Sequence, residues 1–404
     1  MLSYTDARQK VIEVTGGLRH IPGREAVEIS HAFGRILAEP VFADRDYPPF
    51  DRATRDGFAV RAADAAAPGA QLECIGEIRA GGSFDGGVGA RQCVEIMTGA
   101  AVPSGADAVV MVEHTKREGN RITLERVAER GQNIVPQGKE AKANSLLLAH
   151  ATRLGYVELA LAAQVGQARL AVSSRPRVAI LSTGDEVVAV EAQPGPRQIR
   201  NSNGLVLETL VKLGGGEPVQ LGNAPDELGI LRKSIERGLE EDILVLSGGV
   251  SMGKYDLVEQ VLSDLGAEFH FTGVAMRPGR PAVFATCRGK PIFGLPGNPV
   301  STMVTFELFV LPAMDVESGA TPRPLPVFHA KLTATVREKP PLAHFVPARV
   351  EWEGTEARVT VLPWQGSGDV VTLAAANGFL VVSPNRLEIA AGEWADVLPR
   401  RGAF

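Results

Sequence analysis

Residues 243–256 read ILVLSGGVSMGKYD, an apolar run that leads directly into a loop rich in glycine and serine. Consecutive apolar residues from Ile243 to Leu246 are typical of a buried strand, and helical spacing follows from Tyr255 to Leu265. Strands that alternate with helices in this way form a mostly parallel sheet with helices on both faces. The stretch therefore predicts an α/β domain.

The same alternation continues on both sides of this stretch. Predicted strands lie at residues 178–181, 218–221, 268–271, 282–285 and 292–295, and predicted helices lie at 226–238 and 301–310. Another helix is expected to run to Lys212 with Asn203 as its N-cap, and Gly214 follows its end. Together these elements predict a doubly wound α/β domain.

Linker-like segments bound the predicted α/β domain. Ser173–Pro176 precedes it, and the proline-rich segment Thr321–Pro326 follows it. Beyond the second linker, strand-like alternation predicts a small β-barrel or sandwich. Between residues 59 and 148, short strands alternate with glycine clusters, which indicates a β-rich domain. Nearer the start of the chain, Ser3 and Ser30 are predicted helix caps.

Composition and charge exclude several classes of protein. Of the 404 residues, 45% are hydrophobic and 22% charged, as in globular domains. The formal net charge of −5 offers no general attraction to nucleic acid or anionic lipid. The apolar runs are shorter than the roughly 18 residues of a membrane span, and the start lacks a signal-peptide pattern, so we expect a cytoplasmic protein. Three scattered cysteines and seven histidines without an HExxH pattern argue against a zinc site.

The loop after Leu246 has the composition of an anion cradle. Its glycines let backbone N–H groups approach an anion, and Ser247 and Ser251 add hydroxyl donors. The segment nearly matches a P-loop, which makes a nucleotide hydrolase an alternative. Tyr255 stands where that motif needs a Ser or Thr hydroxyl for Mg²⁺, which argues against this alternative.

Other polar loops follow predicted strands, where α/β sheets bind ligands. Residues 182–186 read STGDE, residues 277–280 read RPGR and residues 294–301 read GLPGNPVS. The two arginines suit phosphate or another oxyanion. The last loop opens a helix, with Asn298 or Ser301 as its cap.

Carboxylates gather near the same strand ends, at Asp185, Glu186, Asp226 and Asp256, and Asp56 stands in the preceding domain. Acids beside an anion site make electrostatic sense when a divalent cation bridges them. We therefore expect an oxygen-ligated hard cation such as Mg²⁺ at the strand ends.

The ordered set of motifs resembles the molybdopterin molybdenumtransferase family, the MoeA proteins and the gephyrin E domain, over nearly the whole chain. The resemblance rests on DRATRDGFAV at 51–60, IMTGA at 96–100, PSGADAVV at 103–110, LSTGDE at 181–186, SGGVSMG at 247–253, RPGRP at 277–281, GLPGNPVS at 294–301, QGSG at 365–368 and AANG at 375–378. It implies an α/β multidomain protein. The implied parts are a discontinuous linking domain (1–43 and 143–174), an inserted β-rich domain (44–142), a molybdopterin-binding, doubly wound, mostly parallel α/β domain (175–322) and a C-terminal β-barrel (323–404).

By this resemblance, the protein inserts molybdate into adenylated molybdopterin with release of AMP and uses Mg²⁺. The resemblance implies catalytic roles for Asp56, Asp185, Glu186, Asp226, Asp256, Arg277 and Arg280, and metal binding by Asp185, Glu186, Asp226 and Asp256. It implies binding of the pterin substrate by Thr98, Thr183, Gly184, Asn203, Ser247, Gly248, Gly249, Ser251, Gly253, Pro296, Gly297, Asn298, Pro299, Ser301, Arg349 and Ser367. It also implies an elongated homodimer in which Asp56 acts across subunits, with molybdopterin adenylyltransferase and molybdoenzyme chaperones as candidate partners.

The chain departs from the family pattern at several positions. Arg55 stands where members commonly have Met, Lys139 stands within the usual GED motif, and Gly273 stands where many have a lysine. An arginine usual before the barrel aromatic is lacking before Phe345. Two alternatives therefore remain beside the transferase: a non-catalytic molybdopterin-binding scaffold and a paralogue that prefers another metal, such as tungstate.

Overall fold

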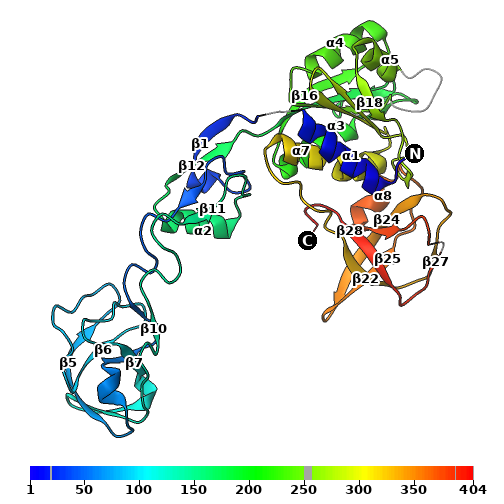
Figure 1. Ribbon diagram of the computed structural model, residues 1–404. Coiled ribbons are helices and arrows are strands. Elements are labelled where there is room, and N and C mark those ends of the chain that lie inside the picture. Colours follow the sequence, from blue (N-terminus) through cyan, green and yellow to red (C-terminus); the bar gives the residue numbers. More distant parts are fainter. Residues whose placement is uncertain (19–20, 250–256, 387, 404) are drawn as a thin grey trace.

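The computed structural model describes residues 1–18, 21–249, 257–386 and 388–403. The chain forms an elongated molecule (Figure 1). An inserted β-rich body lies at one end, an α/β body and a barrel lie together at the other, and a small linking body joins the two ends.

The α/β body is built on a six-stranded sheet in the order β16-β13-β17-β21-β20-β18. The strands are β13 (Arg177–Thr183), β16 (Glu217–Ala224), β17 (Ile243–Ser247), β18 (Glu268–Phe271), β20 (Val283–Cys287) and β21 (Lys290–Leu295). The pairs from β16 to β21 are parallel, and the pairs from β21 to β18 are antiparallel. The prediction of a mostly parallel sheet is confirmed, with an antiparallel edge.

Helices cover both faces of this sheet. They are α1 (Tyr4–Gly17), α3 (Ser202–Gly214), α4 (Leu228–Gly238), α5 (Leu257–Asp264), α6 (Pro299–Thr305) and α7 (Leu311–Glu317). Val178 and Ile180 of β13 pack in a cluster with α1, α3, α6 and α7. Ala179 and Leu181 face the other way and pack with α4 and α5. Side chains that alternate along a strand thus meet two helix layers, as in a doubly wound fold.

Two predicted helix caps are wrong and one is confirmed. Ser3 caps α1 by accepting a hydrogen bond from the Asp6 N–H (3.1 Å). Asn203 does not cap α3, because Asn201 Oδ1 accepts from the Gly204 N–H (2.9 Å) and Asn203 already lies in the helix. Ser30 caps no α-helix, since only a 3₁₀ turn, η1 (Ile29–His31), forms there. The backbone after this turn pairs with residues 152–154 and 171 instead.

The helix predicted at 301–310 is longer than expected. It runs from Pro299 to Glu317, with a π-helical turn, η4 (Phe306–Val310), between α6 and α7. Within the described residues, this run of 19 residues is the one helix long and apolar enough to cross a membrane, contrary to the expectation that no run reaches that length. However, 83% of its apolar window is buried inside the protein, so it packs as a core helix.

The C-terminal body is a closed barrel. Its order is β24-β25-β22-β28-β26, and β26 pairs back with β24. The strands are β22 (Phe328–Leu332), β24 (Ala343–Glu353), β25 (Glu356–Val361), β26 (Gly378–Val382) and β28 (Trp394–Pro399); the short pair β23 (Val336–Arg337) and β27 (Glu388–Ile389) and helix α8 (Val370–Ala375) complete this body. A strand of the α/β body, β19 (Met276–Arg277), adds to β24 in parallel.

The two remaining bodies are small and mostly β. The inserted body has a sheet in the order β7-β4-β6-β5-β9-β8. Its strands are β4 (Gly57–Val60), β5 (Gln71–Ile78), β6 (Gln92–Ile96), β7 (Ala108–Met111), β8 (Thr115–Glu118) and β9 (Arg121–Leu124), with the short pair β3 (Arg52–Ala53) and β10 (Ile134–Val135) and the 3₁₀ turns η2 (Ala62–Ala65) and η3 (Val112–His114). The linking body has the antiparallel pairs β1 (Arg24–Glu28) with β12 (Arg169–Ser173) and β2 (Val41–Phe42) with β11 (Leu146–Leu148), and helix α2 (Tyr156–Gln164). The domain boundaries expected from the sequence stay predictions.

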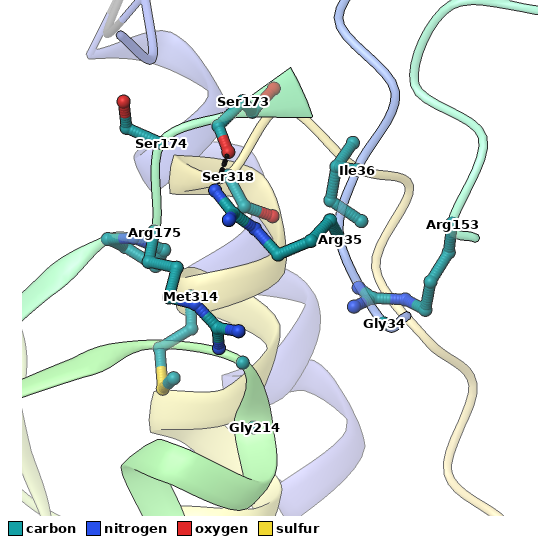
Figure 2. A pocket seen from close by; sticks show the side chains of 12 residues that line it. Gly34, Arg35, Ile36, Arg153, Ser173, Ser174, Arg175, Gly214, Met314 and Ser318 are labelled. Atoms are coloured by element: carbon teal, nitrogen blue, oxygen red, sulfur yellow. Dashed lines mark hydrogen bonds between the residues drawn. The ribbon is translucent and has the colours of Figure 1, made fainter. Parts of the chain in front are cut away.

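Asp315 of α7 joins the linking body to the α/β body. Its carboxylate accepts hydrogen bonds from Arg153 Nη2 (2.7 Å), Arg323 Nη2 (2.7 Å) and Arg323 Nε (3.0 Å), and 2% of its side chain is exposed. Arg153 comes from the linking body, and Arg323 lies between α7 and the barrel. Figure 2 shows the same junction, with Arg35 of the linking body lying beside Ser318, the residue that follows α7, and donating to the Ser173 carbonyl oxygen (2.7 Å).

Removal of the Asp315 carboxylate should destabilise the protein strongly. Asp315→Ala leaves the Arg153 and Arg323 guanidinium groups without their shared buried partner, which costs about 3–5 kcal/mol. Asp396→Ala is the control, because Asp396 pairs with His329 at an exposed position, where such a pair is worth about 0–1 kcal/mol. Urea unfolding of both variants measures the difference; equal losses would contradict the role given to Asp315.

Candidate functional site

Three predicted loops lie at one edge of the sheet, where the parallel strands β13, β17 and β21 end. Ser182 of β13 is aligned with Ser247 of β17, and Ser247 is aligned with Leu295 of β21. Because these strands run in the same direction, the residues that follow them lie side by side. This edge is where the polar loops of the α/β body meet.

A cavity of about 500 Å³ opens at this edge, between the loops, the start of α3 and the loop before α8. Predicted site residues that line it are Thr183, Glu186, Asn203, Ser247, Gly248, Gly297, Asn298 and Pro299. The lining also includes Ser182, Val187, Ile199, Arg200, Asn201, Ser202, Gly368 and Val370, which the sequence analysis did not assign. The cavity wall therefore combines the α/β body with the barrel body.

Some of the unassigned residues had a local signal and others had none. Asn201 and Ser202 stand directly before Asn203, so the polar triplet could have marked the whole helix start. Arg200 is held in the cavity wall because β15 (Ile199–Arg200) pairs with β14 (Val187–Val188). That pairing joins residues of a long loop, and no periodicity in the sequence predicts it.

Gly248 and Gly249 are required by close packing against β13. Gly248 has φ of +95°, and a Cβ there would lie 2.6 Å from the Thr183 carbonyl oxygen. At Gly249, with φ of +63°, a Cβ would lie 2.7 Å from Thr183 Oγ1. The Gly248 N–H donates to the Leu295 carbonyl oxygen (3.1 Å), so this N–H is not available to an anion, contrary to the predicted cradle.

Residues 250–256, which include Ser251, Gly253 and Asp256, lie outside the described residues. Their assignment to substrate and metal stays a prediction from the sequence.

The acids at the strand ends are neighbours. The Asp226 N–H donates to Asp185 Oδ1 (3.0 Å). Burial, followed by the charges of Asp185 and Glu186, raises the pKa of Asp226. Gly184, with φ of +128°, lets the Glu186 carboxylate approach, because a Cβ there would lie 2.6 Å from Glu186 Oε2. Within the described part of the chain, no three Asp, Glu, His or Cys side chains form a group that could hold a metal ion, so the predicted four-acid site is not assembled there.

The turn before α6 connects the cavity to the barrel. Asn298 Nδ2 donates to Ser367 Oγ (2.9 Å), and the Val300 N–H donates to the Ser367 carbonyl oxygen (3.0 Å). Asn298 is the N-cap of α6 by position, although its side chain makes no capping hydrogen bond. Ser301 is buried inside α6, and the Pro296 carbonyl oxygen accepts from Thr302 Oγ1 (2.6 Å), so these two predicted residues shape the turn.

The predicted arginines lie apart from the cavity lining. Arg277 and Arg280 are exposed at the turn that leads from β19 toward β20, and within the described residues neither has an ion pair. Gly273 lies nearby, and a Cβ at this position would be 3.5 Å from Met1 Sδ. Arg349 lies on β24, where its Nε donates to Glu351 Oε1 (3.0 Å). Arg349 is not among the residues that line the cavity.

Asp56 and Thr98 form a separate polar pair in the inserted body. The Thr98 N–H (2.6 Å) and hydroxyl (2.7 Å) both donate to Asp56 Oδ1. These hydrogen bonds lower the pKa of Asp56. The inserted body lies at the end of the molecule opposite the α/β body, so one chain alone does not bring Asp56 to the cavity (Figure 1). Glu140 of the same body pairs with Arg52 (2.8 Å).

Family models match successive parts of the chain. The MoeA N-terminal region (domains I and II) matches residues 2–166, a probable molybdopterin binding domain matches residues 179–316, and the MoeA C-terminal region (domain IV) matches residues 329–399.

Whole-length relatives agree with these matches. A protein of Bacillus subtilis named molybdopterin molybdenumtransferase is 35% identical over 384 residues, which cover 93% of this chain and 89% of that relative. One of the same name from a Nostoc species is 34% identical over 414 residues and covers 98% of this chain and 93% of its own. The solved structure of the molybdopterin biosynthesis MoeA protein from Pyrococcus horikoshii is 29% identical, with a TM-score of 0.83 over 98% of this chain and 99% of that one.

Substitution of Gly248 should lower the free energy of unfolding by more than the strain of its positive φ alone would. Gly248→Ala is expected to lose about 1–3 kcal/mol beyond Gly222→Ala, because its methyl group meets the Thr183 backbone. Gly222 is the matched control, since its φ is +86° and nothing lies within 4 Å of a Cβ there. Chemical denaturation of both variants measures the difference, and equal losses would mean that the close approach to β13 is unimportant.

Neutralisation of Asp226 should stabilise the protein at neutral pH. A carboxyl group whose pKa is raised on folding binds its proton more tightly in the folded state, so its ionised form opposes folding. Asp226→Asn should therefore melt at a higher temperature than the wild type near pH 7. This advantage should disappear as the pH falls below the ordinary Asp pKa, where both states of the wild type are protonated. An increase in the melting temperature of Asp226→Asn over the wild type that is the same at pH 7 and pH 3 would contradict the electrostatic cause.

Proposed function

Since this chain belongs to the MoeA family of molybdopterin molybdenumtransferases and acts in molybdenum cofactor biosynthesis, we propose that it inserts molybdate into adenylated molybdopterin and releases AMP. The observation that carries this proposal is the cavity of about 500 Å³ at the carboxyl ends of β13 and β17. Within the described residues, Thr183 Oγ1 and Asn203 Oδ1 are buried there without a hydrogen-bond partner. Buried polar atoms are normally satisfied, so a bound ligand is a natural partner for them.

Oxyanion binding falls to the arginines near β19. Arg277 and Arg280 carry permanent charges that no described acid neutralises. A guanidinium group offers paired N–H donors that fit phosphate and similar oxyanions. We infer that these side chains, although outside the cavity lining, hold molybdate or the phosphoanhydride of the substrate.

Magnesium is the cation that the acids would suit. Asp185, Glu186 and Asp226 supply carboxylate oxygens. Burial first, and then the charges of Asp185 and Glu186, raise the pKa of Asp226, and a bound cation would offset the repulsion between these charges. When bound, Mg²⁺ would neutralise negative charge on the phosphoanhydride. Asp256 is the fourth acid assigned to this site on sequence grounds. Carboxylate oxygens are the ligands that a hard cation prefers, and the three described acids need a further donor, such as Asp256, to hold it.

The proposal extends to the assembly. Asp56 and Thr98 lie far from the cavity in one chain, so a contribution to catalysis requires the inserted body of a second copy. We therefore propose a homodimer whose cavity is completed across subunits. We also propose that the enzyme acts in the cytoplasm, with the molybdopterin adenylyltransferase and molybdoenzyme chaperones as partners.

AMP release from adenylated molybdopterin, followed in Mg²⁺ with and without molybdate, tests the reaction. The wild type should release AMP in a molybdate-dependent manner. Asp226→Asn should lower that rate by about 100-fold, the scale of losing one electrostatic group at a reacting centre. Glu217→Gln is the control, because Glu217 begins the same strand, β16, at its opposite end and pairs with Arg177 (2.7 Å).

Each outcome assigns a different function. Release that depends on molybdate and is lost in Asp226→Asn but kept in Glu217→Gln supports the transferase. Binding of the pterin without release would favour the scaffold, and release that tungstate supports better than molybdate would favour the paralogue.

A further inference from the structure

The amide group of Asn203 is held in one orientation. Its Nδ2 donates to the Gly297 carbonyl oxygen (2.8 Å) and to Ser247 Oγ (2.9 Å). A carbonyl oxygen only accepts hydrogen bonds, so the NH₂ side of the amide must face Gly297. Both amide hydrogens are then used, and the oxygen points elsewhere.

Asn203 Oδ1 is consequently an acceptor without a donor. It is buried, and no described residue bonds to it. A buried acceptor left unpaired costs about 1–3 kcal/mol, so a ligand that brings a donor gains that amount on binding. An unprotonated phosphate or molybdate oxygen is also an acceptor and would repel this atom. The unpaired acceptor of Asn203 therefore selects against the anionic part of a substrate.

The neighbouring asparagine does not share this property. Asn201 Oδ1 accepts from both Ser182 Oγ (3.1 Å) and the Gly204 N–H (2.9 Å). Its oxygen is already satisfied, although Asn201 also lines the cavity. Thr183 Oγ1, the other unpartnered atom at the cavity, belongs to a hydroxyl that can donate or accept, so it does not discriminate between donors and acceptors on a ligand.

We propose that Asn203 is a specificity residue that accepts a hydrogen bond from an exocyclic amino group of the substrate, so that this wall of the cavity holds an amino-bearing ring and not a phosphate. The inference rests on the proposed function, because adenylated molybdopterin carries two such rings, a pterin and an adenine. In both, the exocyclic amine is the shared donor at the ring edge.

Two ligand pairs test this inference on the whole protein. Pterin is compared with 4-oxopteridine, which lacks the 2-amino group, and AMP is compared with purine riboside 5′-monophosphate, which lacks the 6-amino group. For one pair, the amino-bearing ligand should bind about tenfold more tightly by calorimetry, which corresponds to about 1.4 kcal/mol. The pair that responds identifies the ring.

Protein variants then locate the effect. In Asn203→Ala the preference should fall to about twofold or less, because the acceptor is gone. Asn223→Ala is the matched control. The Asn223 Nδ2 likewise makes two hydrogen bonds, to the carbonyl oxygens of Gly184 and Val187 (both 3.1 Å), but Asn223 does not line the cavity, so the preference should persist. Inorganic phosphate is titrated in parallel and should bind no more weakly to Asn203→Ala than to the wild type.

The inference is overturned by any of three results: neither pair binds or shows a preference in the wild type, the preference survives in Asn203→Ala, or that variant loses phosphate binding. The wild-type comparison remains decisive if Asn203→Ala fails to fold. Binding preferences are measured without turnover, so loss of the preference and failure of molybdate-dependent AMP release are separate results, the first against this inference and the second against the proposed function.

Discussion

The parallel direction of β13, β17 and β21 is the constraint on which the rest of the structure depends. Parallel neighbours place all their carboxyl ends at one edge, and each must be followed by a crossover that returns to the other edge. Strand direction thereby brings the residues after Thr183, Ser247 and Leu295 side by side. The cavity is a consequence of strand direction, and its chemistry is set by what the following loops contain.

The sheet and its helix layers could be predicted because their signal is local and periodic. Val178 and Ile180 face one helix layer, and Ala179 and Leu181 face the other. Because both faces of the strand are buried, its residues form an unbroken apolar run in the sequence. The short 3₁₀ turn after Glu28 could not be predicted in place of a helix, because the backbone hydrogen bonds that prevent a helix come from residues more than a hundred positions away. The cap of α3 lies two residues before the predicted one. Asn201 and Asn203 both have capping side chains, and they differ in their tertiary hydrogen bonds, to Ser182 for Asn201 and to Ser247 and Gly297 for Asn203.

Much less of the candidate site could be predicted from local pattern. The loops that line the cavity were marked by their glycines and polar residues, but the wall formed by Gly368 and Val370 depends on how the barrel docks. Charged residues also divide into two groups that composition does not distinguish. Arg153 and Arg323 pair with the buried carboxylate of Asp315, where the linking body meets the α/β body. Arg277 and Arg280 have no ion pair within the described part of the chain. Only the packed structure reveals which arginines remain available for a ligand.

The short strand β19 gives the barrel a shared boundary with the α/β body. Met276 and Arg277 belong to the α/β body in sequence and to the barrel sheet by hydrogen bonding, through their alignment with Ala343 and His344. The barrel is therefore not an independent module. Replacing it with the barrel of a relative would also replace β24, the strand with which Arg277 is paired. A change in the C-terminal body that breaks this pairing would therefore also alter the position of Arg277.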